Sequence, residues 1–371
     1  MRICILTQPL QTNYGGLLQA YALQTVLKRV GHEVWTEDRR ENRDNLLGVL
    51  KNNAKILLGP IRKFYYPTIS EKKIISKNTN FFIQKYINTT CPIYSTNKSL
   101  FGEYNFDAFI VGSDQVWRPM YSYGIYNYFL DFTIGKNVKR IAYAASFGTD
   151  QWEFTPEQTA VCSELAKQFD AISVREDSAI GLCRQYLNIN AVQLPDPTLL
   201  LDKNDYLEII KNDRPENSHS GGILTYILDD SEIKRSVVQK VSSKLKLNSF
   251  SVMPQAQFKD VGKKGIEKCI YPPVAEWLQG FADADFVGTD SFHGTVFSII
   301  FNKPFISIAN KTRGVSRFIS LLKGFELEDR LIYSEEDFKD NLLNNIDFTE
   351  INIAHNKKRA EALGFLTNAL K

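Results

Sequence analysis

Short apolar runs alternate with helical patterns from the beginning of the chain. The run RICILT at residues 2–7 is typical of a buried β-strand. Beyond it, apolar side chains recur every three or four positions, at Leu17, Ala20, Leu23, Leu27 and Val30. This spacing predicts an amphipathic helix, and Gly31 is the kind of residue that ends one.

The alternation continues as two series separated by a proline-containing segment. Further strands of the first series are predicted at residues 32–38, 106–114, 139–148 and 169–176. The segment AVQLPDPTLLL at 191–201 indicates a boundary, because proline interrupts regular structure. The second series comprises strands at 221–229, 248–253, 285–290 and 304–309 and helices at 232–245, 272–284 and 293–301.

Such alternation is typical of α/β proteins with parallel sheets. We therefore expect two Rossmann-like domains, residues 1–198 and 199–350, with a cleft between them. A last helix is predicted at 356–370, within a C-terminal segment, 351–371, that we expect to pack back on the first domain. Ligands of open α/β sheets bind beyond the carboxyl ends of the strands, so the polar residues there are the candidates for function.

Composition narrows the class of protein. The chain has 371 residues, 43% hydrophobic and 23% charged, which is ordinary for a globular protein of about two domains. Its net charge of +3 is too small to indicate a nucleic-acid partner. The N-terminus lacks the apolar run of a signal peptide, and no stretch approaches the roughly 20 apolar residues of a membrane-spanning helix.

The cysteines narrow the class of protein further. Five cysteines are spread along the chain without a CxxC pair: Cys4, Cys91, Cys162, Cys183 and Cys269. This pattern predicts neither a zinc site nor a disulfide framework, so we expect no metal and a reducing compartment. The expected location is the cytoplasm, with peripheral contact at the inner face of the plasma membrane left open.

Residues 51–86, within an expected excursion at 51–90, differ from the rest. They interleave basic and aromatic residues: Lys51, Lys55, Arg62, Lys63, Phe64, Tyr65, Tyr66, Lys72, Lys73, Lys77, Phe81, Phe82 and Lys85. One interpretation is a solvated helical excursion. The other is a surface that meets anionic lipid headgroups or a lipid-linked substrate.

The sequence VGTDSFHGTVFSII, residues 287–300, places polar groups where a strand hands over to an apolar helix. The first turn of that helix would contain His293 and Gly294 and follow Ser291. Free N–H groups at a helix start suit an anion such as phosphate or carboxylate, and His293 could bind that anion or move a proton. The alternative is that Ser291 is a cap and His293 a satisfied buried histidine.

Two other strand ends carry candidate groups. Ser113, Asp114 and Gln115 follow a strand, and the Asp114 carboxylate could accept a proton or hydrogen bond from a sugar hydroxyl. The alternative for Asp114 is a helix cap. Arg175 ends the strand at 169–176, and its planar guanidinium suits phosphate or carboxylate, the alternative being an ion pair with Glu176 or Asp177.

The remaining candidates lie in two loops. Lys311, Arg313 and Arg317 add positive charge after the strand at 304–309, although most exposed basic residues have no specific role. The turn Asn13-Tyr14-Gly15-Gly16 follows the first strand, and its glycines could let a ligand approach the backbone. This turn is neither GxGxxG nor a Walker motif, so neither a dinucleotide nor a nucleoside triphosphate is indicated.

Taken together, several stretches resemble the polysaccharide pyruvyl transferase family. They are NYGGLLQAYALQ, DAFIVGSDQVWRP, YAASFG, ISVREDSA, LPDPTLLL and WLQGFADADFVGTDSFHGTVFSIIFNKPFISI. Each is weak alone, but their order over about residues 1–310 is specific. Two positions depart from the family, since an arginine often stands where this chain has Ser291, and some members have an acid where it has Gly16.

The resemblance implies a GT-B-like glycosyltransferase fold and transfer of pyruvyl from phosphoenolpyruvate to a sugar of a surface polysaccharide, such as a capsule or exopolysaccharide, usually as a cyclic ketal. No cofactor is needed. On this interpretation Arg175, Ser291, His293, Gly294, Lys311, Arg313 and Arg317 bind the donor. Residues 13–16 and 113–115 bind the acceptor, which is expected to be lipid-linked, and His293 and Asp114 serve as acid and base in either order. The alternatives are a nucleotide-sugar glycosyltransferase and a non-catalytic sugar-binding module.

Overall fold

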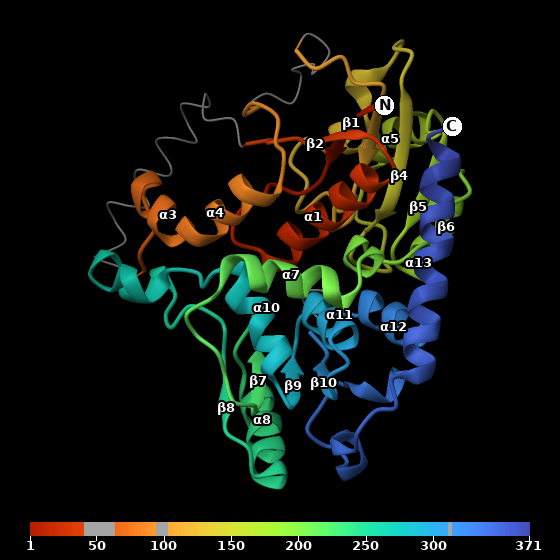
Figure 1. The fold of residues 1–371 in the computed structure, drawn as a ribbon. Coiled ribbons are helices and arrows are strands. Elements are labelled where there is room, and N and C mark those ends of the chain that lie inside the picture. The colour runs from red at the N-terminus through yellow and green to blue at the C-terminus, as the bar shows by residue number, and fades with distance from the viewer. Residues whose placement is uncertain (41–63, 94–102, 311–313) are drawn as a thin grey trace.

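The computed structural model describes residues 1–40, 64–93, 103–310 and 314–371, which form two parallel sheets (Figure 1). The first has the order β2-β1-β3-β4-β5-β6, and the second β11-β10-β9-β7-β8. The strands of the first are β1 (Arg2–Leu6), β2 (Glu33–Thr36), β3 (Ala108–Val111), β4 (Lys139–Ala145), β5 (Ala171–Val174) and β6 (Val192–Gln193). Those of the second are β7 (Ile223–Tyr226), β8 (Ser249–Phe250), β9 (Phe286–Thr289), β10 (Phe305–Ile308) and β11 (Leu331–Ile332).

Helices connect the strands and separate the two sheets. In the first half they are α1 (Tyr14–Arg29), α3 (Ile69–Ile75), α4 (Lys77–Tyr86), α5 (Pro156–Ala166) and α6 (Asp177–Leu182). In the second they are α7 (Lys203–Asp213), α8 (Glu232–Leu245), α9 (Phe258–Val261), α10 (Val274–Asp283), α11 (Phe292–Ile300), α12 (Ser316–Lys323) and α13 (Thr349–Ala369). The strands and helices predicted from the sequence are confirmed, and the predicted α/β class with them.

One prediction about the first loop is wrong. Gly15 and Gly16 do not form a turn before the helix, because α1 already begins at Tyr14. Both glycines therefore lie in the first helical turn, and neither has a positive φ. Their role must come from the small size of glycine rather than from an unusual backbone conformation.

The carboxyl edges of the two sheets face each other. Strand order reverses between β1 and β3 in the first sheet and between β7 and β9 in the second, and such reversals open a crevice for ligands. Gly15, which follows β1, packs against His293, which follows β9. The functional strand ends of both halves therefore meet in one place.

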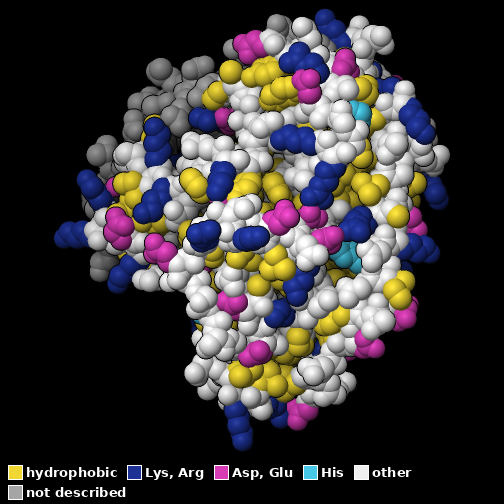
Figure 2. All heavy atoms as spheres, viewed as in Figure 1, with side chains coloured by type: hydrophobic (Ala, Val, Ile, Leu, Met, Phe, Trp, Pro, Cys, Tyr) yellow, Lys and Arg dark blue, Asp and Glu magenta, His cyan; other side chains and the backbone are white. Residues whose placement is uncertain are grey.

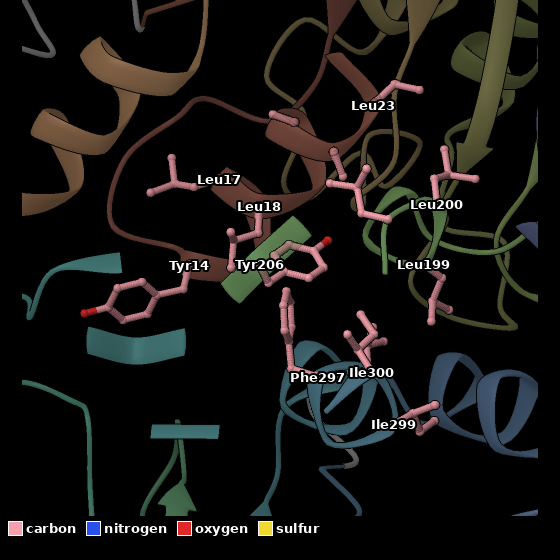
Figure 3. Packing of buried hydrophobic residues seen from close by; sticks show 14 of the residues in the cluster. Tyr14, Leu17, Leu18, Leu23, Leu199, Leu200, Tyr206, Phe297, Ile299 and Ile300 are labelled. Atoms are coloured by element: carbon pink, nitrogen blue, oxygen red, sulfur yellow. The ribbon is translucent and has the colours of Figure 1, made fainter. Parts of the chain in front are cut away.

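A single hydrophobic cluster crosses from one half to the other (Figure 3). It combines Leu17 and Leu18 of α1 with Leu199 of the 3₁₀ helix η4 (Pro197–Leu200), Tyr206 of α7 and Phe297 of α11. The rings of Tyr206 and Phe297 meet edge to face at 4.9 Å. The two halves thus share this cluster, and each half has a further cluster of its own.

The last helix, α13, lies along one side of both halves (Figure 1). Its His355 Nε2 lies 2.8 Å from the Leu199 carbonyl oxygen, and Arg359 lies 3.3 Å from the Asp202 carboxylate. Phe365 approaches Tyr143 of β4. The domain limits at residues 198 and 350 stay a prediction. Among the described helices, none combines the length and the apolar character needed to cross a bilayer.

Substitution of Tyr14 tests how much the packing between the two halves contributes to stability. Its ring stacks on Trp277 of α10 at 5.3 Å, and its hydroxyl donates to the Pro272 carbonyl oxygen at 2.8 Å. We expect Tyr14→Ala to lower the free energy of unfolding by about 3–5 kcal/mol, as for other large aromatic truncations, and Tyr14→Phe by about 1–2 kcal/mol. Urea unfolding measures both. Equal, small losses would contradict the role of the ring in joining the halves.

Candidate active site

A buried carboxylate, Asp196, lies where the two halves meet. It follows β6 and caps η4, with Oδ1 accepting hydrogen bonds from the Thr198 N–H at 3.0 Å and hydroxyl at 2.8 Å. Oδ2 accepts from Arg175 Nη1 at 2.7 Å and from Ser113 Oγ at 3.0 Å. His293 Nε2 lies 3.5 Å from the same oxygen. One carboxylate thus positions side chains from both sheets.

The charge of Asp196 is balanced by its neighbours. Burial alone would raise the pKa of this carboxyl, but His293 and Arg175 hold the pKa well below its usual range. Removing one partner of such a buried pair leaves the other without a counter-charge, which is more costly than never forming the pair. We call Arg175, Glu176, Asp196, His293 and Arg317 the charged cluster.

Two guanidinium groups of the charged cluster lie against one aromatic ring. The Arg175 guanidinium carbon is 4.4 Å from the centre of the Phe292 ring, and that of Arg317 is 5.7 Å from it. Burial lowers the pKa of Arg317 to about 10, and the positive charge of Arg175 adds to this effect. Such mutual repulsion would be relieved by a bound anion.

Arg175 keeps binding capacity for such an anion. Its Nε is 3.7 Å from Glu176 Oε2, beyond hydrogen-bond distance, so the ion pair considered from the sequence is present but long. Neither Nε nor Nη2 of Arg175 has a hydrogen-bond partner among the described residues. A buried N–H without a partner costs about 1–3 kcal/mol, so these groups are suited to a ligand.

His293 is held by its surroundings from two sides. It is the second residue of α11, whose N-cap Ser291 accepts a hydrogen bond from the Gly294 N–H at 3.4 Å. A Cβ added to Gly15 would lie 2.0 Å from His293 Nδ1, so only glycine allows this approach. With Nδ1 facing Gly15 and Nε2 facing Asp196, the imidazole is buried, with 6% of the residue exposed.

Asp114 lies at the crevice between β1 and β3. It adopts a left-handed conformation, φ 75°, and its Oδ1 accepts from the Gln115 N–H at 2.9 Å. Oδ2 lies 3.5 Å from Asn13 Nδ2, and a Cβ on Gly16 would lie 3.1 Å from that amide nitrogen. Burial alone would lower the pKa of Arg175, but Asp196, Glu176 and, to a smaller extent, Asp114 raise it, so the Asp114 charge acts across the site.

Other predicted residues lie elsewhere. The Tyr14 side chain is fully buried between the halves. Gln115 accepts from Arg118 Nη1 at 3.0 Å and packs against Gly148. Gly294 packs against Thr289. Lys311 and Arg313 lie outside the described residues.

Sequence reasoning missed Asp196 and gave Glu176 only the role of a salt-bridge partner. The Glu176 side chain is buried, and its Oε1 accepts from Ser146 Oγ at 2.8 Å and the Gly148 N–H at 2.9 Å. The available signal for Asp196 was a lone acid between two prolines directly after a strand. From the sequence, that segment indicates only a boundary.

Two cavities adjoin the charged cluster. One of about 70 Å³, room for a few small groups, is lined by Arg175, Asp196, Phe292 and Arg317 and by Lys358 and Glu361 of α13. The other, of about 520 Å³, opens between residues 149–151, the start of α6 and residues 314–316 with Ile319. Gly314, at φ 88°, lets residues 314–316 approach residues 148–151 closely, since a Cβ at Gly314 would lie 1.8 Å from the Gly148 carbonyl oxygen.

Among the described residues, no group of His, Cys, Asp or Glu is placed to hold a metal ion.

Comparison with known proteins identifies the family. A family model described as polysaccharide pyruvyl transferase matches residues 13–312. The chain belongs to the polysaccharide pyruvyl transferase family. The matched region of this pyruvyl transferase family member contains Arg175, Asp196 and His293. No curated protein sequence matches the chain.

Several solved structures are similar to this pyruvyl transferase family member. A UDP-GlcNAc 2-epimerase from Neisseria meningitidis bound to UDP-GlcNAc has a TM-score of 0.51 at 10% identity, covering 100% of this chain and 99% of that one. S. aureus MnaA with UDP has a TM-score of 0.48 at 11% identity, covering 91% and 85%. An alpha-glucosyltransferase in complex with UDP has a TM-score of 0.46 at 10% identity, covering 99% of this chain and 95% of that one. The two parallel sheets and the similarity to the epimerase confirm the predicted GT-B type of fold, two Rossmann-like halves.

The contact between Gly15 and His293 leads to a first prediction for the site. Gly15→Ala should move the imidazole and lower the free energy of unfolding by about 1–3 kcal/mol through overpacking. The measurement is the imidazole NMR signal of His293, assigned with His293→Gln, together with urea unfolding. Gly181→Ala is the matched control, because an added Cβ there meets nothing within 4 Å. An unmoved His293 signal in Gly15→Ala would contradict the close approach.

The buried charge of Asp196 leads to a second prediction for the site. Asp196→Asn should lower the free energy of unfolding by about 3–5 kcal/mol at pH 7, because the buried Arg175 loses its counter-charge. Since the folded pKa of Asp196 is depressed, its charge stabilises the protein above the unfolded pKa of about 4 and this gain is lost as pH falls below it. The difference between wild type and variant should therefore shrink below about pH 4.

Unfolding curves over a pH series test this, with Asp340→Asn as the control. Asp340 pairs with Lys244 but its side chain is 75% exposed, so its loss should cost little. A difference between wild type and Asp196→Asn that stays constant as the pH falls would show that the Asp196 charge contributes no stability.

Proposed function

We propose that this protein transfers a pyruvyl group from phosphoenolpyruvate to a sugar of a bacterial-type surface polysaccharide precursor and releases phosphate. The expected product is a cyclic pyruvate ketal. The observation that carries the proposal is the buried Arg175 guanidinium, whose Nη2 has no hydrogen-bond partner in the described part of the chain, at a cavity that it shares with Arg317. Membership of the pyruvyl transferase family supports the reaction class.

Phosphoenolpyruvate carries a phosphate and a carboxylate, and the charged cluster offers matching groups. The planar guanidinium of Arg175 is suited to two parallel hydrogen bonds with either anion. Arg317 adds a second positive charge beside the Phe292 ring. Arg317 would thereby supply positive charge beside Phe292, the residue after Ser291, where the family resemblance leads us to expect an arginine.

The chemistry needs an acid, a base and anion binding. A proton added to the methylene carbon leaves positive charge on the central carbon of the donor. A sugar hydroxyl attacks that carbon and loses its proton, and phosphate then departs with its bridging oxygen. A second hydroxyl attacks the same carbon, loses its proton and closes the ketal.

His293 and Asp114 are our candidates for the proton transfers. The Asp196 carboxylate lies 3.5 Å from Nε2 and can fix the orientation of the imidazole. His293 would serve either as the acid for the methylene carbon or as a hydrogen-bond donor to the phosphate. Asp114 would act as the base toward the acceptor, and the two roles could be exchanged.

The larger cavity is the proposed entrance for the acceptor. Its volume of about 520 Å³ falls in the range of small-ligand sites, and its wall carries hydroxyl, amide and carboxylate groups that suit sugar hydroxyls. It borders the charged cluster, because Asp177 follows Glu176 and Ser316 precedes Arg317. The acceptor would therefore reach the donor from this side.

A thermal-shift panel of phosphoenolpyruvate, UDP, GDP and CMP tests the donor. A ligand present at 100 times its dissociation constant stabilises the folded state by about 2.7 kcal/mol. We expect a shift with phosphoenolpyruvate and none with the nucleotides. A shift with a nucleotide alone would instead support a nucleotide-sugar glycosyltransferase, the rival that the same fold allows.

Variants then assign the residues. Arg175→Lys should lose most of the phosphoenolpyruvate shift because a point charge cannot replace the planar group, whereas the exposed Arg184→Lys should keep it. His293→Gln should lower turnover per folded molecule by about two to four orders of magnitude. Because His293 is buried, melting temperature is recorded on the same samples. Normal turnover in the folded fraction would leave His293 only a structural role.

A further inference from the structure

Two segments far apart in the sequence form one lobe beside the first half. They are residues 64–86, with α3 and α4, and residues 258–269, with α9 and the 3₁₀ helix η5 (Lys263–Cys269). The Tyr65 N–H donates to the Lys259 carbonyl oxygen at 2.9 Å, and the Tyr65 ring lies against Gly262. We call these two segments together the basic lobe, which projects at the left of Figure 1.

The basic lobe carries an excess of positive charge. It has eight exposed lysines: Lys72, Lys73, Lys77, Lys85, Lys259, Lys263, Lys264 and Lys268. Its acids are Glu71, Asp260 and Glu267. The net positive charge of the lobe is therefore larger than that of the whole chain, which is +3. Only Lys85 forms an ion pair with a described residue, Asp213 at 2.6 Å.

Large apolar side chains are exposed between these lysines, as the left side of Figure 2 shows. The exposed fractions are 42% for Phe64, 36% for Tyr66, 52% for Ile69, 40% for Ile74 and 53% for Phe81. The helix α3 buries none of its residues. Neither Ile69 nor Ile74 contributes to a hydrophobic cluster, so the packing of the described residues does not explain this surface.

We propose that the basic lobe docks the protein on an anionic phospholipid bilayer. Lysine side chains next to an anionic membrane each strengthen binding by roughly fivefold, and exposed aromatic and aliphatic groups enter the headgroup region. A nucleic acid would use the lysines but gain little from Ile69 and Ile74. The interleaving of both kinds of side chain therefore favours the membrane.

The lobe is connected directly to the candidate site. Tyr271 follows it, and the Tyr271 N–H donates to the Ile75 carbonyl oxygen at 3.0 Å. The next carbonyl, Pro272, accepts from Tyr14, whose neighbour Gly15 contacts His293. Docking would thus hold the site near a lipid-linked sugar, a consequence that rests on the proposed function, whereas membrane binding itself does not.

Co-sedimentation of the full chain with vesicles tests the proposal. We expect binding at low salt to phosphatidylcholine vesicles that contain phosphatidylglycerol, weaker binding at high salt, and none to phosphatidylcholine alone. Lys72→Glu/Lys263→Glu/Lys264→Glu should weaken binding at least tenfold. The control Lys246→Glu/Lys339→Glu/Lys357→Glu changes the net charge equally at exposed positions outside the lobe and should bind nearly as wild type.

A second variant, Ile69→Ser/Phe81→Ser, tests the apolar contribution and should leave binding that is more sensitive to salt. No binding of the wild type at low salt would overturn the proposal. So would an equal loss in the control variant, or retention on RNA but not on vesicles. Neither donor nor acceptor is present in this assay, so its failure would leave the proposed pyruvyl transfer untouched.

Discussion

The arrangement of the site depends on the buried charge of Asp196. Its carboxylate belongs to the segment that joins the two halves, and it holds Arg175 from one sheet and faces His293 from the other. A carboxylate can remain ionised at such a depth only with close positive partners. The relative placement of the two halves and the charge state of the site are therefore set by the same contacts.

The second constraint is steric. His293 can approach α1 only because Gly15 has no side chain, and residue 314 can approach residue 148 only because it is a glycine. Both contacts join the first half to the second. Close backbone approaches and one buried carboxylate thus locate the candidate groups within a small volume, which electrostatic stabilisation of a reacting anion requires.

Much of the fold followed from the sequence, because strands buried on both faces and amphipathic helices leave clear periodic patterns. Strand ends also indicated Arg175, His293 and Asp114. The importance of Asp196 could not be predicted, since it depends on which side chains from distant strands converge on it. The basic lobe could be predicted only in part. The basic and aromatic composition of residues 64–86 is evident from the sequence, but only the fold shows that the four lysines of residues 259–268 lie beside them.

The shared hydrophobic core limits how such a protein can move. Leu17, Leu199, Tyr206 and Phe297 belong to one cluster, so wide separation of the halves would expose apolar surface that is now buried (Figure 3). Helix α13 adds a further tie, because it begins after the second sheet and contacts both η4 and β4. We therefore expect the chain to unfold as one cooperative unit and access to the site to depend on local loop and side-chain rearrangements, so that neither half could be exchanged without rebuilding the other.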